Sequence, residues 1–579
     1  MFWKKKSTGY PSIDRTHLRD TTFWERHPFI PNVNLSTAID WVSRGHLDMP
    51  VAEQRDLLVT RGEYIADAKM VSKALLQLGI KKGDIITVMM PNLYQGLVIF
   101  KAANRIGAIT TFLNTNTSEK ELRDYLDLYQ SPLLVTYDKD RYYAEKITQN
   151  SPLKYVINVA KKYVDSRWQA NFPKVEDHMI QYHHLECFAK YWRKPSTHLS
   201  TIFGGHKDAL ILYTSGSTKG QPKSVLFTNK NAVASLTYLK YSTHAKPYDP
   251  KSFWWLGVVP YMYPYGFVCS TLVPLLGGFG ARIAPDLNTK TLDYYYAKDS
   301  EVVCAHPNFL EITQRQLSAD VRLPSLKTVL CGGDFLSAKR SRKAAWFFRQ
   351  HGAFGATICN GSGTCETLGA STNAMGAPYR PETVGQLMLG PKYLVINKDT
   401  MSETKYGEAG ELWTAGKHVF KEYYHDPVTT QKAKISYQGT EYYRTGIYGF
   451  VDEDRYFTLI GRAARFFITS PEDGGSYKVY CEYVQTALSD LNMVHDCVVV
   501  DTNDPVCVKA GKAYVKLEDN VEASETTKNQ ILDLLAQNSP LKPYEIPKSI
   551  TFVEQFPHTK AGKVDYEALR KLAKQENNI

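Results

Sequence analysis

The segment from Tyr213 to Val225 reads YTSGSTKGQPKSV and gathers residues that can bind an anion. Glycine lets backbone N–H groups turn toward an anion, hydroxyl side chains add donors, and lysine adds a positive charge. We expect phosphate contacts from Thr214, Ser215, Gly216, Ser217, Thr218 and Lys223. The composition and order favour phosphate binding over the alternative of an ordinary polar surface loop.

Apolar runs on both sides of this loop predict that it connects two strands. Residues 209–212 precede it and residues 225–227 follow it. The spacing G-x-x-x-x-G-K-[ST] of the common nucleoside-triphosphatase loop, which leads into a helix, does not occur in this segment. The loop therefore indicates a phosphate site of another type.

Further short motifs follow along the chain. They are GIKKGD at 79–84, PYMYPYG at 260–266, GGD at 332–334, NGSGTCE at 360–366, YRTG at 443–446, GR at 461–462 and PHTKAGK at 557–563. Together with the loop, they resemble the ordered motifs of the adenylate-forming superfamily. That superfamily includes acyl-CoA synthetases, firefly luciferases and the adenylation domains of peptide synthetases. Several motifs in the family's order are far more specific than any one of them alone.

The resemblance implies an α/β fold with two domains. We expect a large N-terminal domain with several sheets over residues 1–462 and a small, mobile lid domain over residues 463–579. In the second part, apolar strands alternate with helical patterns, as expected for a compact α/β domain. The predicted strands are 497–500, 513–517 and 549–553, and the predicted helices are 528–536 and 566–573.

The resemblance also implies a reaction. A carboxylate is a poor acyl donor because its leaving group would be oxide. Members of the superfamily use ATP and Mg²⁺ to convert the acid to an acyl-adenylate, and acyl-CoA synthetases then transfer the acyl group to coenzyme A. The demand on the protein is mostly electrostatic, because two anions must approach each other.

The motifs assign roles to individual residues by resemblance. Lys563 and Glu366 would be catalytic, and Glu366 would also bind Mg²⁺, which prefers a few carboxylate and phosphate oxygens. An ordinary lysine pKa of about 10.4 would keep Lys563 charged. Further residues implied for ATP binding are Gly333, Asp334, Asn360, Gly361, Ser362, Cys365 and Arg462. Those implied for the acid pocket are Tyr263 and Asn308.

Four positions depart from the family pattern. Ser362 replaces the aromatic residue that stacks on adenine, and Cys365 replaces a threonine that donates to the α-phosphate. Ile447 replaces the aspartate that holds both ribose hydroxyls, and Ala464 replaces a charged hinge residue. A lost charged hydrogen bond, worth about 1.5–3 kcal/mol, predicts nucleotide binding weaker by about one to two powers of ten. By the same argument, Ile447→Asp is predicted to tighten ATP binding.

Composition narrows the partners and the compartment. The net charge of +11 over 579 residues favours anionic partners. No dense basic run or nucleic-acid motif occurs, so nucleic acid is not expected. Nine cysteines without a C-x-x-C pair fit the cytoplasm. The uncharged segment 252–281 contains three prolines and five glycines, so we expect buried strands and a pocket wall rather than a transmembrane segment.

Two other functions remain open from the sequence. A ligase that loads the acyl group onto a separate acyl carrier protein would share the first half-reaction. A non-catalytic homologue that binds a nucleotide or acyl group would explain the four departures. The intact loop, together with Glu366, Arg462 and Lys563, favours an enzyme over this second alternative.

Overall fold

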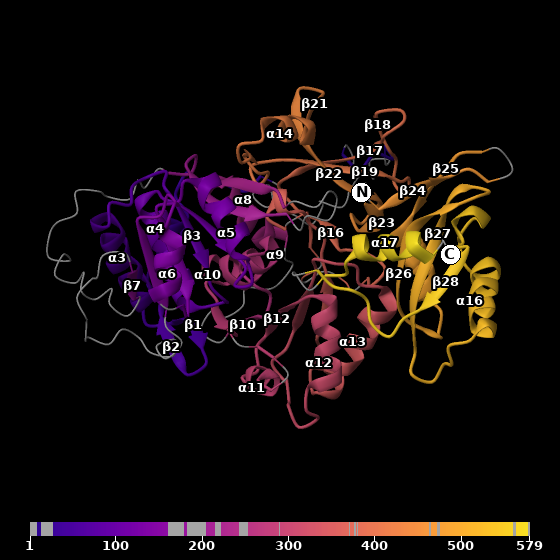
Figure 1. The fold of residues 1–579 in the computed structure, drawn as a ribbon, viewed down its shortest axis with the longest axis horizontal. Coiled ribbons are helices and arrows are strands. Elements are labelled where there is room, and N and C mark those ends of the chain that lie inside the picture. The colour runs from indigo at the N-terminus through magenta and orange to yellow at the C-terminus, as the bar shows by residue number, and fades with distance from the viewer. Residues whose placement is uncertain are drawn as a thin grey trace, which may run out of the picture.

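The computed structural model has a large part and a small part, which meet along one face (Figure 1). The residues that the structure describes are 8–12, 27–139, 141–159, 179–181, 204–214, 222–242, 253–285, 287–288, 290–369, 371–373, 375, 378, 380–462, 465–471, 475–559 and 563–576. The yellow C-terminal elements lie at one end of the molecule in Figure 1, and the indigo N-terminal elements lie at the other. The prediction of an α/β fold with a large N-terminal and a small C-terminal domain is confirmed.

An eight-stranded sheet with the order β20-β9-β8-β4-β3-β5-β6-β7 forms one half of the large part. Its strands are β3 (Ile85–Met89), β4 (Ile109–Leu113), β5 (Leu133–Tyr137), β6 (Tyr155–Val159), β7 (Met179–Gln181), β8 (Asp208–Tyr213), β9 (Ser224–Thr228) and β20 (Glu422–Tyr423). The accompanying helices are α2 (Leu35–Ser43), α3 (Arg61–Gln77), α4 (Tyr94–Ile106), α5 (Glu119–Tyr129), α6 (Arg141–Thr148) and α8 (Asn229–Ser242). Strands β8 and β9 pair antiparallel, so the predicted strand–loop–strand arrangement is confirmed.

A seven-stranded, mostly parallel sheet forms the other half, with the order β14-β13-β12-β10-β11-β1-β2. Its strands are β1 (Pro50–Gln54), β2 (Leu57–Thr60), β10 (Trp254–Gly257), β11 (Gly280–Ile283), β12 (Val302–Ala305), β13 (Thr328–Cys331) and β14 (Thr357–Asn360). Helices α11 (Leu292–Ala297), α12 (Pro307–Gln316) and α13 (Ala338–Gln350) belong to this half. The carboxyl ends of β13 and β14 lead directly into the motifs at 332–334 and 360–366, and β12 ends just before α12, which contains Asn308.

The sequence predicted buried strands for the uncharged segment 252–281. The structure has strands only near its two ends, β10 and β11. Between β10 and β11 it forms α9 (Pro264–Phe267), a π-helical turn (Val268–Leu272) and α10 (Val273–Gly277). Apolar runs of this length do not distinguish a buried helix from a buried strand. Among the described residues, no helix is long and apolar enough to cross a membrane.

An antiparallel sheet forms the third part of the large domain. Its strands are β17 (Lys392–Asn397), β18 (Ser402–Glu403), β19 (Gly410–Ala415), β21 (Lys434–Tyr437), β22 (Thr440–Val451) and β23 (Phe457–Arg462). Short β15 (Thr372–Asn373) and β16 (Gln386–Leu387) pair nearby, and α14 (Pro427–Ala433) precedes β21. The pairing of β19 with β22 shifts register near Gly446, whose φ of +68° suits glycine in such a bulge.

The small part contains β24 (Phe466–Thr469), β25 (Tyr477–Tyr480), β26 (Val494–Asp504), β27 (Val508–Leu517) and β28 (Ser549–Phe552). Its helices are α15 (Cys481–Ser489), α16 (Glu525–Asn538) and α17 (Tyr566–Glu576). All of the strands and helices predicted for this region are present, whereas α15, β24 and β25 were not predicted. The boundary after Arg462 stays a prediction, since residues 463–464, including Ala464, lie outside the described residues.

Salt bridges connect α13 of the large part to β26 and a neighbouring residue of the small part. Arg340 contacts Glu311 of α12 at 2.9 Å and Asp496 of β26 at 3.1 Å. Lys339 contacts Glu518 at 3.2 Å and also donates to the backbone carbonyl of Val494 at 2.6 Å. These contacts link α12 and α13 of the large part to the small part.

The eight cysteines that the structure describes are all free. Most are buried, and burial raises the pKa of the Cys331, Cys359 and Cys497 thiols to between about 11 and about 12. Protonated thiols of this kind behave as small apolar side chains. The remaining cysteine, Cys187, lies outside the described residues.

Candidate active site

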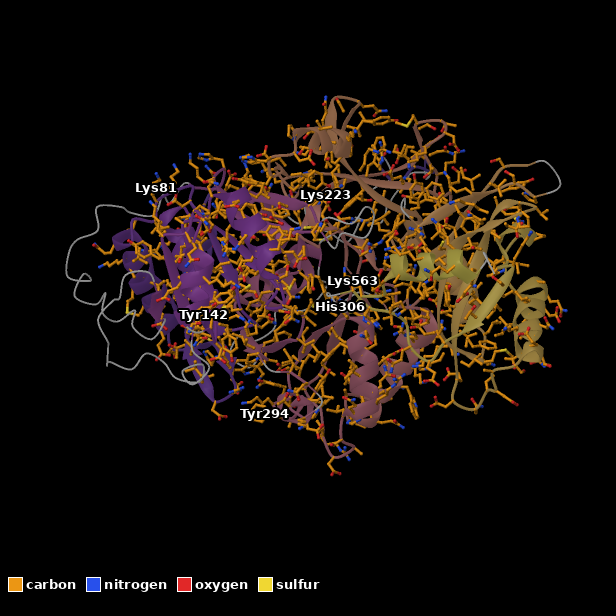
Figure 2. All side chains as sticks on the ribbon, in the orientation of Figure 1. Lys81, Tyr142, Lys223, Tyr294, His306 and Lys563 are labelled. Atoms are coloured by element: carbon orange, nitrogen blue, oxygen red, sulfur yellow. The ribbon has the colours of Figure 1, made fainter. Side chains whose placement is uncertain are left out.

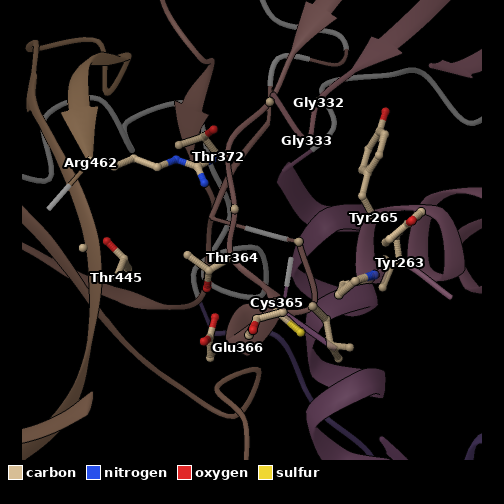
Figure 3. A pocket seen from close by; sticks show the side chains of 18 of the residues that line it. Tyr263, Tyr265, Gly332, Gly333, Thr364, Cys365, Glu366, Thr372, Thr445 and Arg462 are labelled. Carbon is tan, nitrogen blue, oxygen red and sulfur yellow. The ribbon is translucent and has the colours of Figure 1, made fainter. Parts of the chain in front are cut away.

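A cavity of about 620 Å³ lies where the three sheets of the large part meet the small part. Of the residues predicted for the site, it is lined by Thr214, Lys223, Tyr263, Gly333, Gly361, Cys365, Glu366, Arg462 and Lys563. Figure 3 shows Arg462 reaching in from the antiparallel sheet, with Tyr263 and Tyr265 on the opposite side and Glu366 below Arg462, beside Cys365. Residues from positions 213 to 563 of the chain thus meet at one cavity.

The two ends of the predicted phosphate loop are fixed by their own hydrogen bonds. The N–H of Thr214 donates to the carbonyl of Lys223 at 3.0 Å, and the N–H of Lys223 donates to Thr214 Oγ1 at 2.9 Å. These bonds continue the ladder between β8 and β9 and place both residues at the cavity. The loop residues Ser215, Gly216, Ser217 and Thr218 lie outside the described residues, so their contacts stay a prediction.

Glu366 lies on a single 3₁₀ turn (Cys365–Thr367) and is 7% exposed. Its Oε1 accepts a hydrogen bond of 2.6 Å from the hydroxyl of Tyr423. Its backbone carbonyl accepts the N–H of Phe420 at 2.8 Å. The carboxylate is therefore held at the cavity wall by the segment that contains β20.

Lys563 of the small part lines the cavity, and Figure 2 shows it near the middle of the molecule, in the same region as His306. Burial lowers the pKa of Lys563 to about 8; Asp334 opposes this shift, whereas Arg462 and Arg465 reinforce it. The expectation of an ordinary lysine pKa is therefore wrong, because several cations share a poorly solvated site. An anion placed among these cations would be attracted by all of them and would raise the pKa of Lys563 again.

Arg465 joins the two parts, and the sequence motifs did not indicate it. Its guanidinium lies 3.6 Å from the ring centroid of Tyr566 and 3.3 Å from Glu482, both in the small part. It also approaches Asp334 of the large part at 4.0 Å. Because Arg465 lines the cavity, it adds a third fixed cation beside Arg462 and Lys563.

Asp334 and Asn308 were predicted for the ATP site and the acid pocket, but the structure places both on a second cavity of about 320 Å³. Asp334 Oδ2 accepts the N–H of Val564 at 3.3 Å, so its carboxylate is used to dock the small part. Burial opposes ionisation of Asp334, but Arg465 and Lys563 outweigh it and lower its pKa. Asn308 lies in the first turn of α12 and, unlike Tyr263, is not among the described residues that line the main cavity.

Asn360 and Ser362 are not among the described residues that line the main cavity. Asn360 is the buried last residue of β14, where it pairs with Cys331. The N–H of Ser362 donates to Thr372 Oγ1 at 2.9 Å, and the carbonyl of Ser362 accepts the N–H of Thr372 at the same distance. Both residues shape the loop that presents Gly361 and Cys365 rather than facing the cavity.

Ile447 is 2% exposed and packs in an apolar cluster with Val384, Leu412 and Phe457. An aspartate at this position would enter that cluster, so the prediction that Ile447→Asp tightens ATP binding is not supported by the packing. A different carboxylate, Glu411, lines the main cavity. It is 2% exposed and accepts from Arg444 at 3.1 Å and from the N–H of Gly446 at 3.2 Å.

The end of the cavity formed by α9 and its neighbours is largely apolar and aromatic. Residues lining this end include Leu239, Tyr263, Tyr265, Val268, Cys269 and Leu330. The hydroxyl of Tyr265 donates to the carbonyl of Leu330 at 2.8 Å, so its ring is fixed. His306 lines both cavities, and burial, followed by the charge of Lys563, lowers its pKa to about 4, which keeps the imidazole neutral.

Comparisons with known proteins match both parts of the chain. The family model described as AMP-binding enzyme matches residues 40–424, and the model of the AMP-binding enzyme C-terminal domain matches residues 483–563. The long-chain-fatty-acid–CoA ligase of Bacillus subtilis (strain 168) is 24% identical over 87% of this chain and 88% of its own. The acetyl-coenzyme A synthetase of Emericella nidulans is 23% identical over 90% of this chain and 77% of its own.

A solved structure shows the same fold. The anthranilate CoA ligase AuaEII in complex with anthranoyl-AMP superposes with a TM-score of 0.78 over 95% of this chain and 99% of its own, at 19% identity. The two family models together span most of the chain, and residues from both matched ranges line the cavity. The protein belongs to the AMP-forming acyl-CoA ligase superfamily of adenylate-forming enzymes.

Proposed function

We propose that the protein activates a carboxylic acid with ATP and transfers the acyl group to the thiol of coenzyme A. The observation that carries this proposal is the entry of Lys563 from the small part into the cavity that also contains Lys223, Glu366 and Arg462. A cation on a separate domain suits the step in which a carboxylate and a triphosphate must approach each other.

In the first half-reaction a bond forms between a carboxylate oxygen and the α-phosphorus of ATP. The bond from that phosphorus to the oxygen that bridges to the β-phosphate breaks, and the β- and γ-phosphates leave together as pyrophosphate. Lys563 would hold the two approaching anions, and Arg462 and Lys223 would hold the phosphate groups. In the second half-reaction a thiol sulfur attacks the acyl carbon, AMP leaves, and the thiol proton is released. The fixed cations of the site would stabilise the phosphate of AMP as it leaves.

The residues at the cavity fit a magnesium ion that is bound together with the nucleotide. Within the described part of the chain, no cluster of three His, Cys, Asp or Glu side chains could hold a metal by itself. Mg²⁺ commonly uses one or two carboxylates together with substrate phosphates, and Glu366 supplies one buried carboxylate at the cavity. The ion would neutralise phosphate charge, and Glu366 would hold it in place.

The apolar end of the cavity supports an organic acid with an apolar body, such as a fatty or aromatic acid. Tyr263 forms part of this end, and burial raises the pKa of its phenol to about 12, so it stays uncharged. Coenzyme A is the acceptor that we propose, and an acyl carrier protein is the alternative. The cytoplasmic location and the domain boundary at residue 462 remain predictions.

Product analysis tests this proposal. The protein would be incubated with ATP, Mg²⁺ and a panel of alkanoic and aromatic acids, with coenzyme A or with a pantetheinylated carrier protein as acceptor. We expect AMP, pyrophosphate and a thioester of coenzyme A in equal amounts for at least one acid. A thioester formed only on the carrier protein would contradict the proposal that coenzyme A is the acceptor. Release of ADP in place of AMP would contradict the proposed AMP-forming reaction.

A further inference from the structure

Tyr423 occupies a fixed place between two elements of the proposed phosphate site. It belongs to β20, which pairs antiparallel with β9 and places Tyr423 opposite Val225. The N–H of the next residue, Tyr424, donates to the carbonyl of Ser224 at 2.8 Å. Tyr423 is 4% exposed and lines the main cavity. Its position is therefore set by the strand that directly follows the phosphate loop.

Two contacts of the Tyr423 side chain reach different charged residues. Its hydroxyl donates to Glu366 Oε1 at 2.6 Å, which is a short, charge-assisted hydrogen bond. The Nζ of Lys223 lies 4.9 Å from the centroid of its ring, within the range of a cation–π interaction. One tyrosine thus contacts a carboxylate and an ammonium that come from separate parts of the sequence.

The geometry makes the hydroxyl of Tyr423 the donor, because the Glu366 carboxylate oxygen at 2.6 Å accepts. A side-chain hydrogen bond also links Glu366 to the buried Tyr443, and the Tyr423 bond takes one lone pair of Oε1, so the carboxylate keeps further acceptor positions. The nearby Phe420 N–H also holds the Glu366 backbone, so the same segment fixes both ends of this residue.

We propose that Tyr423 is a positioning residue that orients Glu366 toward a phosphate-bound Mg²⁺ and at the same time supports the ammonium of Lys223. The inference rests on the proposed function, since it requires ATP and Mg²⁺ to bind at this cavity. A tyrosine that only filled the core could be replaced by phenylalanine without consequence for the metal. The hydroxyl and the ring therefore predict different effects, and two substitutions separate them.

The experiment measures ATP binding by calorimetry, with and without Mg²⁺, in wild-type protein and variants. Tyr423→Phe removes the hydroxyl and keeps the ring beneath Lys223. We expect it to reduce the gain in ATP affinity produced by Mg²⁺ by roughly tenfold or more, as for loss of a hydrogen bond to a charged group. Affinity for ATP without Mg²⁺ should change by less than about threefold, because Lys223 keeps its support.

Tyr423→Leu removes both contacts and should also weaken Mg²⁺-free binding by roughly threefold. This additional loss should disappear when Lys223 is replaced by alanine in both proteins, because the ring then has no ammonium to support. Tyr424→Phe is the matched control, since the Tyr424 ring packs against Tyr129, and it should match the wild type.

Each outcome decides the inference. An unchanged magnesium effect in folded Tyr423→Phe, with ATP binding by the wild type intact, would overturn the inference and leave the proposed function standing. An equal loss with and without Mg²⁺ would indicate a general packing role and would also overturn it. Wild-type protein that binds no ATP in either condition would overturn the proposed function and this inference together.

Discussion

Lys563→Ala is expected to abolish adenylation without harming the fold. Lys563 is a cation from the small part in a cavity that is also lined by Arg462 and Arg465. Removing one preorganised donor from a site of developing charge commonly lowers the rate by about 10²–10³. Transfer from a supplied acyl-adenylate should remain largely intact, because that step no longer requires two anions to approach.

The effect on stability has the opposite sign. Burial lowers the pKa of Lys563 from 10.5 to about 8, so a charged Lys563 destabilises the folded protein by up to about 3 kcal/mol at neutral pH. That destabilisation is fully present below pH 8 and is relieved as the pH rises from about 8 toward 10.5, where the unfolded lysine also loses its proton. Loss of the apolar stem offsets part of the gain. The melting temperature of Lys563→Ala at pH 7 should therefore equal or exceed that of the wild type.

The assay compares both half-reactions and thermal unfolding in the same preparations. Lys571→Ala, which removes an exposed lysine of α17, is the matched control and should change neither. The kcat/KM for adenylation by the wild type, which reports the ionisations of the free enzyme, should decline as the pH rises above about 8, and this decline should be absent from the residual activity of Lys563→Ala. Equal loss of both half-reactions together with a lower melting temperature would refute the reasoning and indicate a folding defect.

Three further predictions follow from the packing. Ile447→Asp buries a carboxylate in an apolar cluster, so it should destabilise the protein by about 3 kcal/mol or more in denaturant titration. Tighter ATP binding by this variant would contradict the placement of residue 447 in that cluster. Glu411→Gln should weaken ATP binding and reduce any preference for ATP over 2′-deoxy-ATP, because a buried carboxylate at the cavity can accept hydrogen bonds from sugar hydroxyls. Equal ATP affinities of the variant and the wild type in calorimetry would exclude that role. Arg340→Ala leaves Asp496 without its partner across the domains and should speed proteolysis between residues 462 and 466, whereas an unchanged cleavage rate would show that other contacts hold the small part.

The sequence predicted the parts of the site that depend on local motifs. The motifs predicted the two strands around the phosphate loop, and β8 and β9 are present there. They also predicted one site for four residues, and the same cavity is lined by Lys223, Glu366, Arg462 and Lys563. Arg462 ends β23, Lys223 directly precedes β9, and Glu366 lies in the turn Cys365–Thr367. The small domain was predictable for the same reason, since its strands and helices alternate clearly.

The sequence could not predict where side chains point once distant segments pack together. Asp334 neighbours Gly333 in the chain, yet it faces the second cavity because Val564 and Arg465 of other segments attract its carboxylate. Tyr423 stands in an ordinary aromatic run, and only the pairing of β20 with β9 brings it to Glu366. The lowered pKa of Lys563 likewise results from burial among cations that are distant in sequence.

The most direct test of the central claim is isotope exchange between pyrophosphate and ATP, measured across a panel of carboxylic acids without any thiol acceptor. We predict exchange that depends on both Mg²⁺ and the acid for wild-type protein and Lys571→Ala, with a loss of about 10²-fold or more in Lys563→Ala. Wild-type protein that catalyses no acid-dependent exchange with any acid, while binding ATP in calorimetry, would contradict the claim and indicate a nucleotide-binding protein without ligase activity.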